Sequence, residues 1–194
     1  LKVCTSRDEL IDSIDTDTAI VYLSHADYRS GECWNMADIN HRAHAVDALT
    51  VWDLSHSTGA IPVDLTRDDA DFAVGCGYKY LSGGPGGSAY LWINPRHAEN
   101  GWPTICGWMG HLDVFAFATE YEPLTGAGRH ATGTPAVIAN EIFFCAAQIW
   151  QEVDEKQLWA KHKALGDLTM ELLEQECGSL GVTINTPREY KQRG

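Results

Sequence analysis

Short apolar segments alternate with longer polar or amphipathic segments over the first half of the chain. The predicted strands are residues 17–23, 49–53, 72–74 and 88–93. Short runs that are apolar throughout are typical of parallel strands buried on both faces. Residues 38–48 have helical periodicity and are expected to cross back over the sheet, and a shorter helix is predicted over 7–14. This alternation predicts an α/β fold, with a mainly parallel sheet flanked by helices.

The pattern changes after residue 100. Residues 100–134 lack regular periodicity and are rich in glycine, proline and aromatic residues. An irregular segment of this length in a compact domain is usually functional. Pro135 is expected to open a long helix that runs to about residue 153, since proline favours the first helical turn. A second helix is predicted over 155–175, and a short strand over 183–186.

Composition and charge narrow the classes of function. Apolar residues make up 44% of the 194 residues, which is ordinary for a globular protein. The net charge of −13 argues against binding to nucleic acid or anionic membranes. No apolar stretch is long enough for a membrane helix, and no signal peptide precedes Leu1. These features predict a cytoplasmic protein.

The cysteines and histidines do not indicate a metal site. Six cysteines are scattered without a C-x-x-C pair, so buried reduced thiols are expected rather than zinc ligands or disulfides. Among eight histidines, His41 and His44 are three residues apart on a predicted helix but have no third ligand nearby. A polar helix face is the simpler interpretation, and we expect no metal.

A single lysine stands out between the third predicted strand and a glycine cluster. Lys79 lies between two tyrosines, Tyr78 and Tyr80, and the cluster 83–87 follows. Desolvation disfavours the charged form of lysine and makes it a candidate imine-forming amine. The alternative is a surface lysine in a glycine-rich turn. The cluster lacks the phosphate-binding P-loop pattern, so we interpret it as a turn that lets the backbone pass close to the lysine.

An acid ends the preceding strand. Asp53 follows the apolar run 49–52, at the end where open α/β sheets bind ligands. Pyridoxal-phosphate (PLP) enzymes use a lysine to bind the cofactor aldehyde and an acid to pair with the pyridinium nitrogen. Asp53 and Lys79 at neighbouring strand ends therefore form a moderately specific signal for PLP. The alternative role for Asp53 is a helix N-cap.

Longer motifs around these residues carry a family resemblance. They are Val51-Trp-Asp-Leu-Ser-His-Ser-Thr-Gly-Ala-Ile-Pro-Val-Asp-Leu65, Gly75-Cys-Gly-Tyr-Lys-Tyr-Leu-Ser-Gly-Gly-Pro-Gly86, Leu23-Ser-His-Ala-Asp-Tyr-Arg-Ser-Gly31 and Gly107-Trp-Met-Gly-His111. The sequence resembles the kynureninase family, which are PLP-dependent enzymes on the class V branch of the aspartate aminotransferase fold. The resemblance covers nearly the whole chain, but full-length relatives are about twice as long, which suits two domains. It implies that residues 1–150 are the central part of a PLP-binding large domain. Residues 151–194 would be a connecting helix and the start of an incomplete small domain.

The resemblance assigns roles to four residues near the predicted strand ends. Lys79 would form the Schiff base with PLP and later take the substrate Cα proton. Asp53 would pair with the pyridinium nitrogen, and His56 would lie beside the cofactor. Tyr78 would bind the cofactor phosphate and serve in proton transfer. Without the family, His56 would be a structural histidine and Tyr78 an interface aromatic.

Two further cofactor contacts are implied from the irregular segment. Trp108 and Thr134 correspond to residues that reach the cofactor phosphate from the partner subunit of a homodimer. Without the family, Trp108 would be a core tryptophan and Thr134 the N-cap of the helix that follows. Both roles are compatible for Thr134, since helix N-termini attract phosphate.

The implied reaction is hydrolysis of the Cβ–Cγ bond of L-kynurenine, or of its 3-hydroxy form. The products are L-alanine and anthranilate or 3-hydroxyanthranilate, in tryptophan catabolism and NAD biosynthesis. Thr134, where some relatives have asparagine, favours the bacterial type and plain kynurenine. Two alternatives remain: another class V PLP enzyme such as a cysteine desulfurase, or an inactive α/β dimerisation core.

Parts of the family's site lie outside these 194 residues. The loop with most phosphate contacts would precede Leu1, and the arginine that binds the substrate carboxylate would follow Gly194. From the residues present we expect weak cofactor binding and little turnover by this chain alone.

Overall fold

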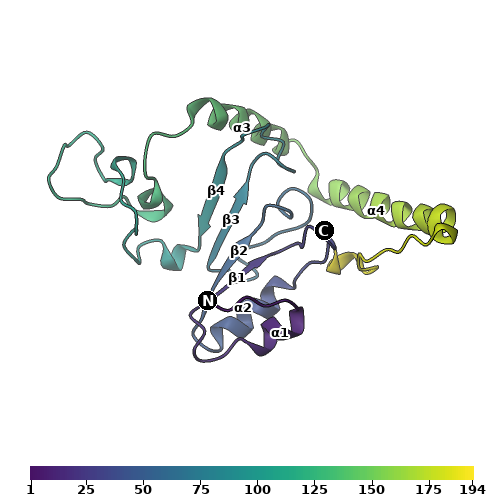
Figure 1. Cartoon of the computed structure of the whole chain (residues 1–194). Coiled ribbons are helices and arrows are strands. Elements are labelled where there is room, and N and C mark those ends of the chain that lie inside the picture. Colours follow the sequence, from purple (N-terminus) through teal and green to yellow (C-terminus); the bar gives the residue numbers. More distant parts are fainter.

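The computed structural model describes all 194 residues and has a four-stranded sheet at its centre (Figure 1). The strands follow the order β1 (Ile20–Ser24), β2 (Leu49–Asp53), β3 (Phe72–Cys76) and β4 (Ala89–Ile93). The first three strands are parallel, and β4 is antiparallel to β3. The prediction of an α/β fold with a mainly parallel sheet and flanking helices is therefore confirmed.

One face of the sheet carries the hydrophobic core. Alternate residues of β1 to β3 are buried on this face and pack with α2 (Met36–His44), while leucine and isoleucine side chains of α1 (Arg7–Asp12) cover its margin. Trp52 in β2 is 1% exposed, and its indole N–H donates a 2.8 Å hydrogen bond to the side-chain oxygen of Asn40 in α2. The buried indole thus has the partner that its polar atom needs.

The opposite face is more open than the sequence predicts. Ile20 and Tyr22 of β1 are 58% and 59% exposed, and Leu91 of β4 is 40% exposed. We expected strands buried on both faces, but in this chain the burial of β1 to β3 alternates along each strand. The apolar runs therefore predicted the positions of the strands correctly. The prediction that both faces of these strands are buried was wrong.

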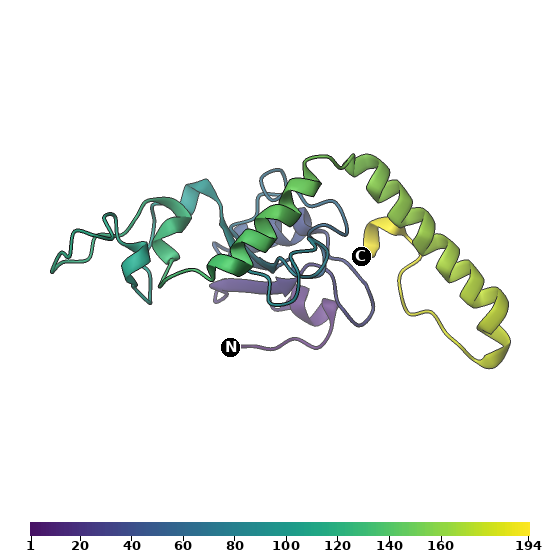
Figure 2. The ribbon, with the colours of Figure 1, turned by 90° about the horizontal axis from the view of Figure 1, so that it is seen from above.

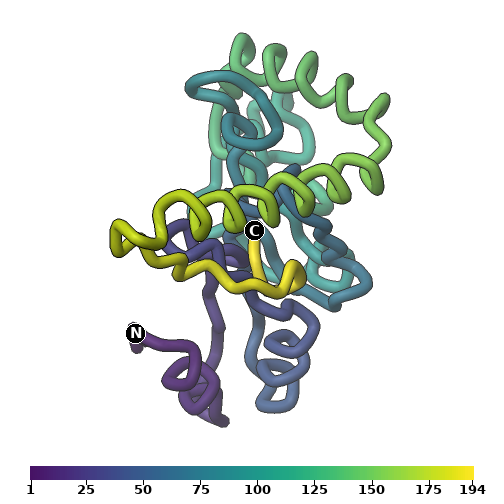
Figure 3. Tube along the Cα trace, turned by 90° about the vertical axis from the view of Figure 1, so that its right-hand side faces the viewer, coloured from purple at the N-terminus to yellow at the C-terminus, as the bar shows by residue number.

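Two long helices follow the sheet. Helix α3 (Val137–Trp150) runs across the end of the sheet at which β3 finishes, and α4 (Glu155–Cys177) extends away from the body (Figures 1 and 2). The chain then turns back alongside α4 (Figure 3), and the buried Arg193 pairs with Asp167 of that helix. No helix is both long and apolar enough to cross a bilayer.

Residues 98–136, which we call the arm, project from the opposite side of the molecule to α4 (Figures 1 and 2). Their only helical turns are η2 (Trp108–Gly110) and η3 (Gly126–His130), so the prediction of an irregular segment is confirmed. The buried Arg129 donates hydrogen bonds to the carbonyl oxygen of Gly101 and to the Glu99 carboxylate, which ties the two ends of the arm together.

Several predicted boundaries were wrong. The long helix begins at Val137, and its N-cap is Ala136, whose side chain caps nothing. Thr134 is thus not an N-cap, because Pro135 lies outside the helix. Residues 183–186 form no strand, since no neighbouring strand lies beside them to accept their hydrogen bonds. The first strand begins at Ile20 rather than at residue 17.

The cysteines also differ from expectation. All six are free thiols, but only Cys33 is buried. Burial raises the pKa of the Cys33 thiol to about 11. Cys106 in the arm and Cys145 on α3 are exposed.

Candidate active site

The carboxyl ends of the parallel strands bring several polar residues to one edge of the sheet. Ser24, the last residue of β1, pairs in register with Asp53, the last residue of β2. Asp53 in turn pairs with Val74 of β3, and Lys79 follows the end of β3 by three residues. The predicted acid and the predicted amine therefore leave neighbouring strands at the same edge.

Lys79 meets a histidine at this edge. Its Nζ lies 2.7 Å from Nε2 of His56, which belongs to the loop 54–61 after β2. The side chain of Lys79 is half-buried, and its Nζ also lies 5.8 Å from the ring centroid of Tyr78. Tyr28 stacks on His56, with the two ring centroids 6.0 Å apart. The amine thus contacts the His56 imidazole and lies near the Tyr78 ring.

Asp53 is half-buried and has one oxygen available. Its Oδ1 accepts a 2.8 Å hydrogen bond from the backbone N–H of Ser55, while Oδ2 has no partner in the chain. The helix N-cap alternative is wrong, because a loop and not a helix follows β2. A fixed carboxylate with a free oxygen can accept a further hydrogen bond or pair with a cation.

The glycine cluster folds back onto the backbone just before Lys79. The N–H of Gly83 donates to the carbonyl oxygen of Gly77, and the N–H of Gly77 donates to that of Ser88, both at 2.8 Å. A Cβ at Gly83 would lie 2.7 Å from the Gly77 oxygen, and the ring of Phe143 from α3 packs on both glycines. The interpretation as a turn that lets the backbone pass close to the lysine is confirmed.

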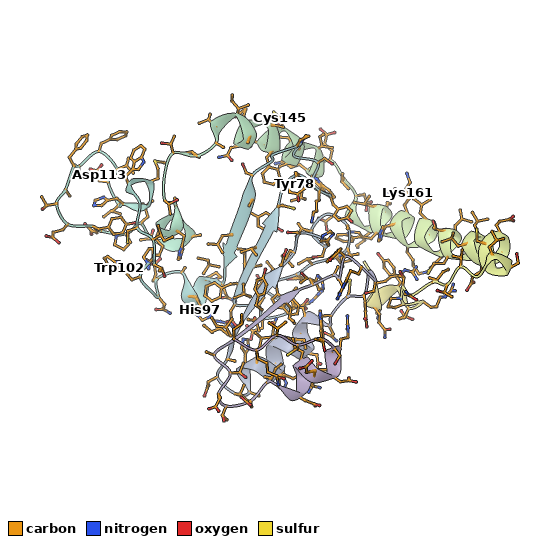
Figure 4. The ribbon with its side chains drawn as sticks, in the orientation of Figure 1. Tyr78, His97, Trp102, Asp113, Cys145 and Lys161 are labelled. Carbon is orange, nitrogen blue, oxygen red and sulfur yellow. The ribbon has the colours of Figure 1, made fainter.

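The two residues predicted from the irregular segment form no hydrogen bond with these groups. Trp108 is in the arm, half exposed, with an edge-to-face contact to Phe115. Thr134 is exposed at the junction of the arm and α3. The part of the arm marked by Trp102 and Asp113 lies well apart from Tyr78 (Figure 4). A single chain therefore gathers His56, Lys79 and Tyr78 with Asp53 on the next strand end, without the arm.

Three groups at this edge were not singled out from the sequence as site residues. Ser24 could have been found, because it ends a predicted strand as Asp53 does. The stack of Tyr28 on His56 and the 2.6 Å hydrogen bond between Thr58 and Tyr90 join residues far apart in sequence. Only the folded chain shows these contacts.

The fold is that of PLP enzymes of fold type I, to which the family that matches this chain and a solved structure similar to it belong. The chain belongs to the aminotransferase class-V family, whose model matches residues 4–193. Enzymes of this family use PLP.

Similar proteins agree with this assignment. The chain is 40% identical over its whole length to a kynureninase from Pseudomonas fluorescens, and 40% identical over 96% of its length to one from Deinococcus radiodurans. It spans about half of these relatives, 47% and 46% of their lengths. In structure it is similar to a cysteine desulfurase from Thermococcus onnurineus, with a TM-score of 0.76, 23% identity, and coverage of 96% of this chain and 45% of the other. At 23% identity, the structural similarity to the cysteine desulfurase shows the fold alone.

The donor set at the sheet edge fits PLP. The cofactor has an aldehyde that needs an amine, a pyridinium nitrogen that needs an acid, and a phenolic oxygen that needs a polar neighbour. Lys79 offers the amine, the free Oδ2 of Asp53 offers the acid, and His56 lies beside the amine. Ser24 adds a hydroxyl at the same edge.

Proposed function

We propose that this chain carries the PLP-binding centre of an enzyme that hydrolyses the Cβ–Cγ bond of L-kynurenine or 3-hydroxykynurenine. The products would be L-alanine and anthranilate or its 3-hydroxy form. The main support is the 40% identity to a kynureninase over the full 194 residues. The contact between Lys79 and His56 at the edge that also carries Asp53 supports the same proposal.

Asp53 and His56 would hold the cofactor. The free Oδ2 of Asp53 would pair with the pyridinium nitrogen, while Oδ1 stays on the Ser55 N–H and fixes the direction of the carboxylate. His56, already 2.7 Å from Lys79, would remain beside the atoms that react. When bound, PLP supplies an electron sink that lets a Cα–H bond break.

Lys79 and Tyr78 would move the protons. The Lys79 amine would hold the cofactor aldehyde and would take the proton from the substrate Cα. Water adds to the side-chain ketone and the Cβ–Cγ bond breaks. Tyr78 is half exposed beside Lys79 and would return a proton to the three-carbon product, which becomes alanine.

The arm suggests that a second copy of the chain completes the site. We propose a homodimer in which Trp108 and Thr134 of one subunit reach the cofactor phosphate of the other. Large apolar side chains of the arm are exposed, among them Ile105 at 71%, Phe115 at 73% and Phe117 at 91%. Helix α3 is exposed as well, with Ile138 at 79%. Apolar surface of this kind is typical of an interaction site.

We also propose a domain division, a cellular location and a metabolic role for the enzyme. Residues 1–150 would be the central part of the large domain, and 151–194 the connecting helix and the start of a small domain. The direction of α4 away from the sheet is consistent with this (Figure 2). The enzyme would be cytoplasmic and serve tryptophan catabolism and NAD biosynthesis, as a protein with no nucleic-acid or membrane partner.

A cysteine desulfurase is the alternative that the similar fold keeps open. The test is to incubate the purified protein and PLP with L-kynurenine, 3-hydroxykynurenine or L-cysteine in separate reactions. Release of anthranilate or 3-hydroxyanthranilate supports the proposal, and release of sulfur from cysteine favours the alternative. If the cofactor binds but no substrate is converted, the chain is an inactive α/β core.

A further inference from the structure

A tyrosine outside the proposed site reaches the loop that carries His56. Tyr90 lies in β4, opposite Gly75 of β3, and its hydroxyl shares a 2.6 Å hydrogen bond with Oγ1 of Thr58. Burial raises the pKa of the Tyr90 phenol, so it is uncharged at neutral pH. The bond therefore joins two neutral hydroxyls across the width of β3.

Gly75 makes this reach possible. A Cβ built on Gly75 would lie 2.2 Å from the Tyr90 hydroxyl oxygen and 2.4 Å from the ring carbon that bears it. Atoms cannot approach so closely, so any side chain at this position would displace the ring. The ring of Tyr90 occupies the space that a β3 side chain would otherwise fill.

The loop is fixed on its other side as well. Gly59 has a φ of +86°, which glycine adopts without strain. A Cβ at Gly59 would lie 3.1 Å from the carbonyl oxygen of Tyr80 and 3.1 Å from the ring of Trp150 in α3. The loop therefore packs directly on Tyr80, the residue after Lys79, while Tyr90 holds it at Thr58.

We propose that Tyr90 is a positioning residue for the pair formed by His56 and Lys79. It contacts neither side chain, but it holds Thr58, two residues after His56, and so fixes where the imidazole meets the amine. This inference rests on the proposed roles of Lys79 and His56. It predicts that loss of a single oxygen atom in Tyr90→Phe loosens the loop and changes the reactivity of Lys79.

The first test needs no cofactor. Amide hydrogen exchange of residues 54–61 is measured in the protein without PLP, for the unchanged chain and for Tyr90→Phe and Thr58→Val. Both variants should exchange about fivefold faster in this loop, the factor that corresponds to one ordinary hydrogen bond. The double variant should match either single variant, because both remove the same bond. Tyr22→Phe is the control, since the Tyr22 side chain is exposed and has no hydrogen bond. Unchanged exchange in Tyr90→Phe would overturn the proposal.

The second test asks whether the effect reaches Lys79 through His56. The pH dependence of the rate at which PLP and borohydride modify Lys79 is measured in the same variants. Tyr90→Phe should displace this pH profile in the direction that His56→Gln does, and should have no further effect in a His56→Ala background. A faster-exchanging loop with an unmoved profile would make Tyr90 a local structural residue and overturn the positioning role. If the unchanged protein does not react with PLP at all, the proposed function fails, and the positioning role fails with it. The hydrogen-exchange result would still show whether the bond between Tyr90 and Thr58 stabilises the loop 54–61.

Discussion

The imidazole of His56 lies 2.7 Å from the amine of Lys79, although 23 residues separate them in sequence. The two reach each other because β2 and β3 are parallel neighbours, so that the loops after both strands begin at one edge. The turn at Gly77 and Gly83 then brings the lysine back toward the sheet. This relationship is the geometric basis of the proposed PLP centre.

Replacing His56 tests whether that contact matters for the reaction. His56→Ala removes the only hydrogen-bond partner of the Lys79 amine. In the whole enzyme whose PLP-binding centre this chain would carry, we expect kynurenine hydrolysis to fall roughly 10²-fold, because His56 would no longer hold the reacting groups in place. The rate of anthranilate release measures it. His41→Ala is the matched control, since His41 is exposed on α2, and equal rates in the two variants would contradict the assignment.

Asp53→Asn separates the chemical role of Asp53 from its structural one. Asparagine keeps an oxygen that accepts the Ser55 N–H, so the thermal unfolding temperature should not change. The charge that would pair with the pyridinium nitrogen is lost, and turnover by the whole enzyme should fall on the order of 10²–10³-fold. Asp53→Ala should lose both turnover and about 1 kcal/mol of stability. Turnover of Asp53→Asn within twofold of the unchanged protein would show that Asp53 is not the acid partner.

The glycine turn can be tested without any substrate. In Gly83→Ala the new methyl group would lie 2.7 Å from the Gly77 carbonyl oxygen, a backbone atom that cannot move freely. We expect a loss of about 1–3 kcal/mol in the free energy of unfolding, measured by urea denaturation. Gly133→Ala is the control, because a Cβ at Gly133 meets open space. Equal stability of the two variants would mean that the turn does not need its close backbone contact.

A buried carboxylate at the other end of the sheet should govern stability in acid. Asp71 is 1% exposed and accepts hydrogen bonds from the side chains of Arg96, His44 and His97 and from the N–H of Thr50. Burial alone would raise the pKa of this carboxyl, but the hydrogen bonds outweigh it and hold the pKa well below its usual 3.8. Its contribution to stability is therefore complete above about pH 4 and is lost as the pH falls further.

Asp71→Asn should therefore destabilise the protein at neutral pH, by roughly 1.5–3 kcal/mol, because it replaces charge-assisted hydrogen bonds of a buried carboxylate with weaker neutral ones. Urea denaturation at pH 7 and at pH 3 measures the difference, which should shrink at the lower pH. Tyr78 and His97 lie at opposite ends of the sheet (Figure 4), so the folded variant should still bind PLP. A difference that is the same at both pH values would contradict the ionic role.

Much of the fold could be predicted because local patterns determine it. The run 49–53 is apolar and ends in an acid, and β2 has those same limits. The start of α3 was harder: Pro135 is compatible with a first helical turn, yet the helix begins two residues later. The open face of β1 could not be predicted either, because an apolar residue such as Ile20 looks the same whether a neighbour covers it or not.

Some residues of the candidate site could likewise be predicted from local patterns, and others could not. Asp53 and Lys79 are recognisable because each follows a strand, and parallel strands end at one edge. The contact between Tyr90 and Thr58 depends on the register of β4, which places Tyr90 opposite Gly75. A pattern of apolar and polar residues does not contain that register, so the contact was found only in the folded chain.

The most direct test of the proposed PLP centre is reduction with borohydride after incubation with PLP, followed by mass mapping of the modified peptides. Lys79 is half-buried beside His56, whereas Lys161 lies on α4 far from the sheet (Figure 4) and reports general surface modification. We predict a label confined to Lys79 and lost in Lys79→Arg. A label that is absent, or spread over Lys161 and other surface lysines, would contradict the assignment of this edge as the cofactor site.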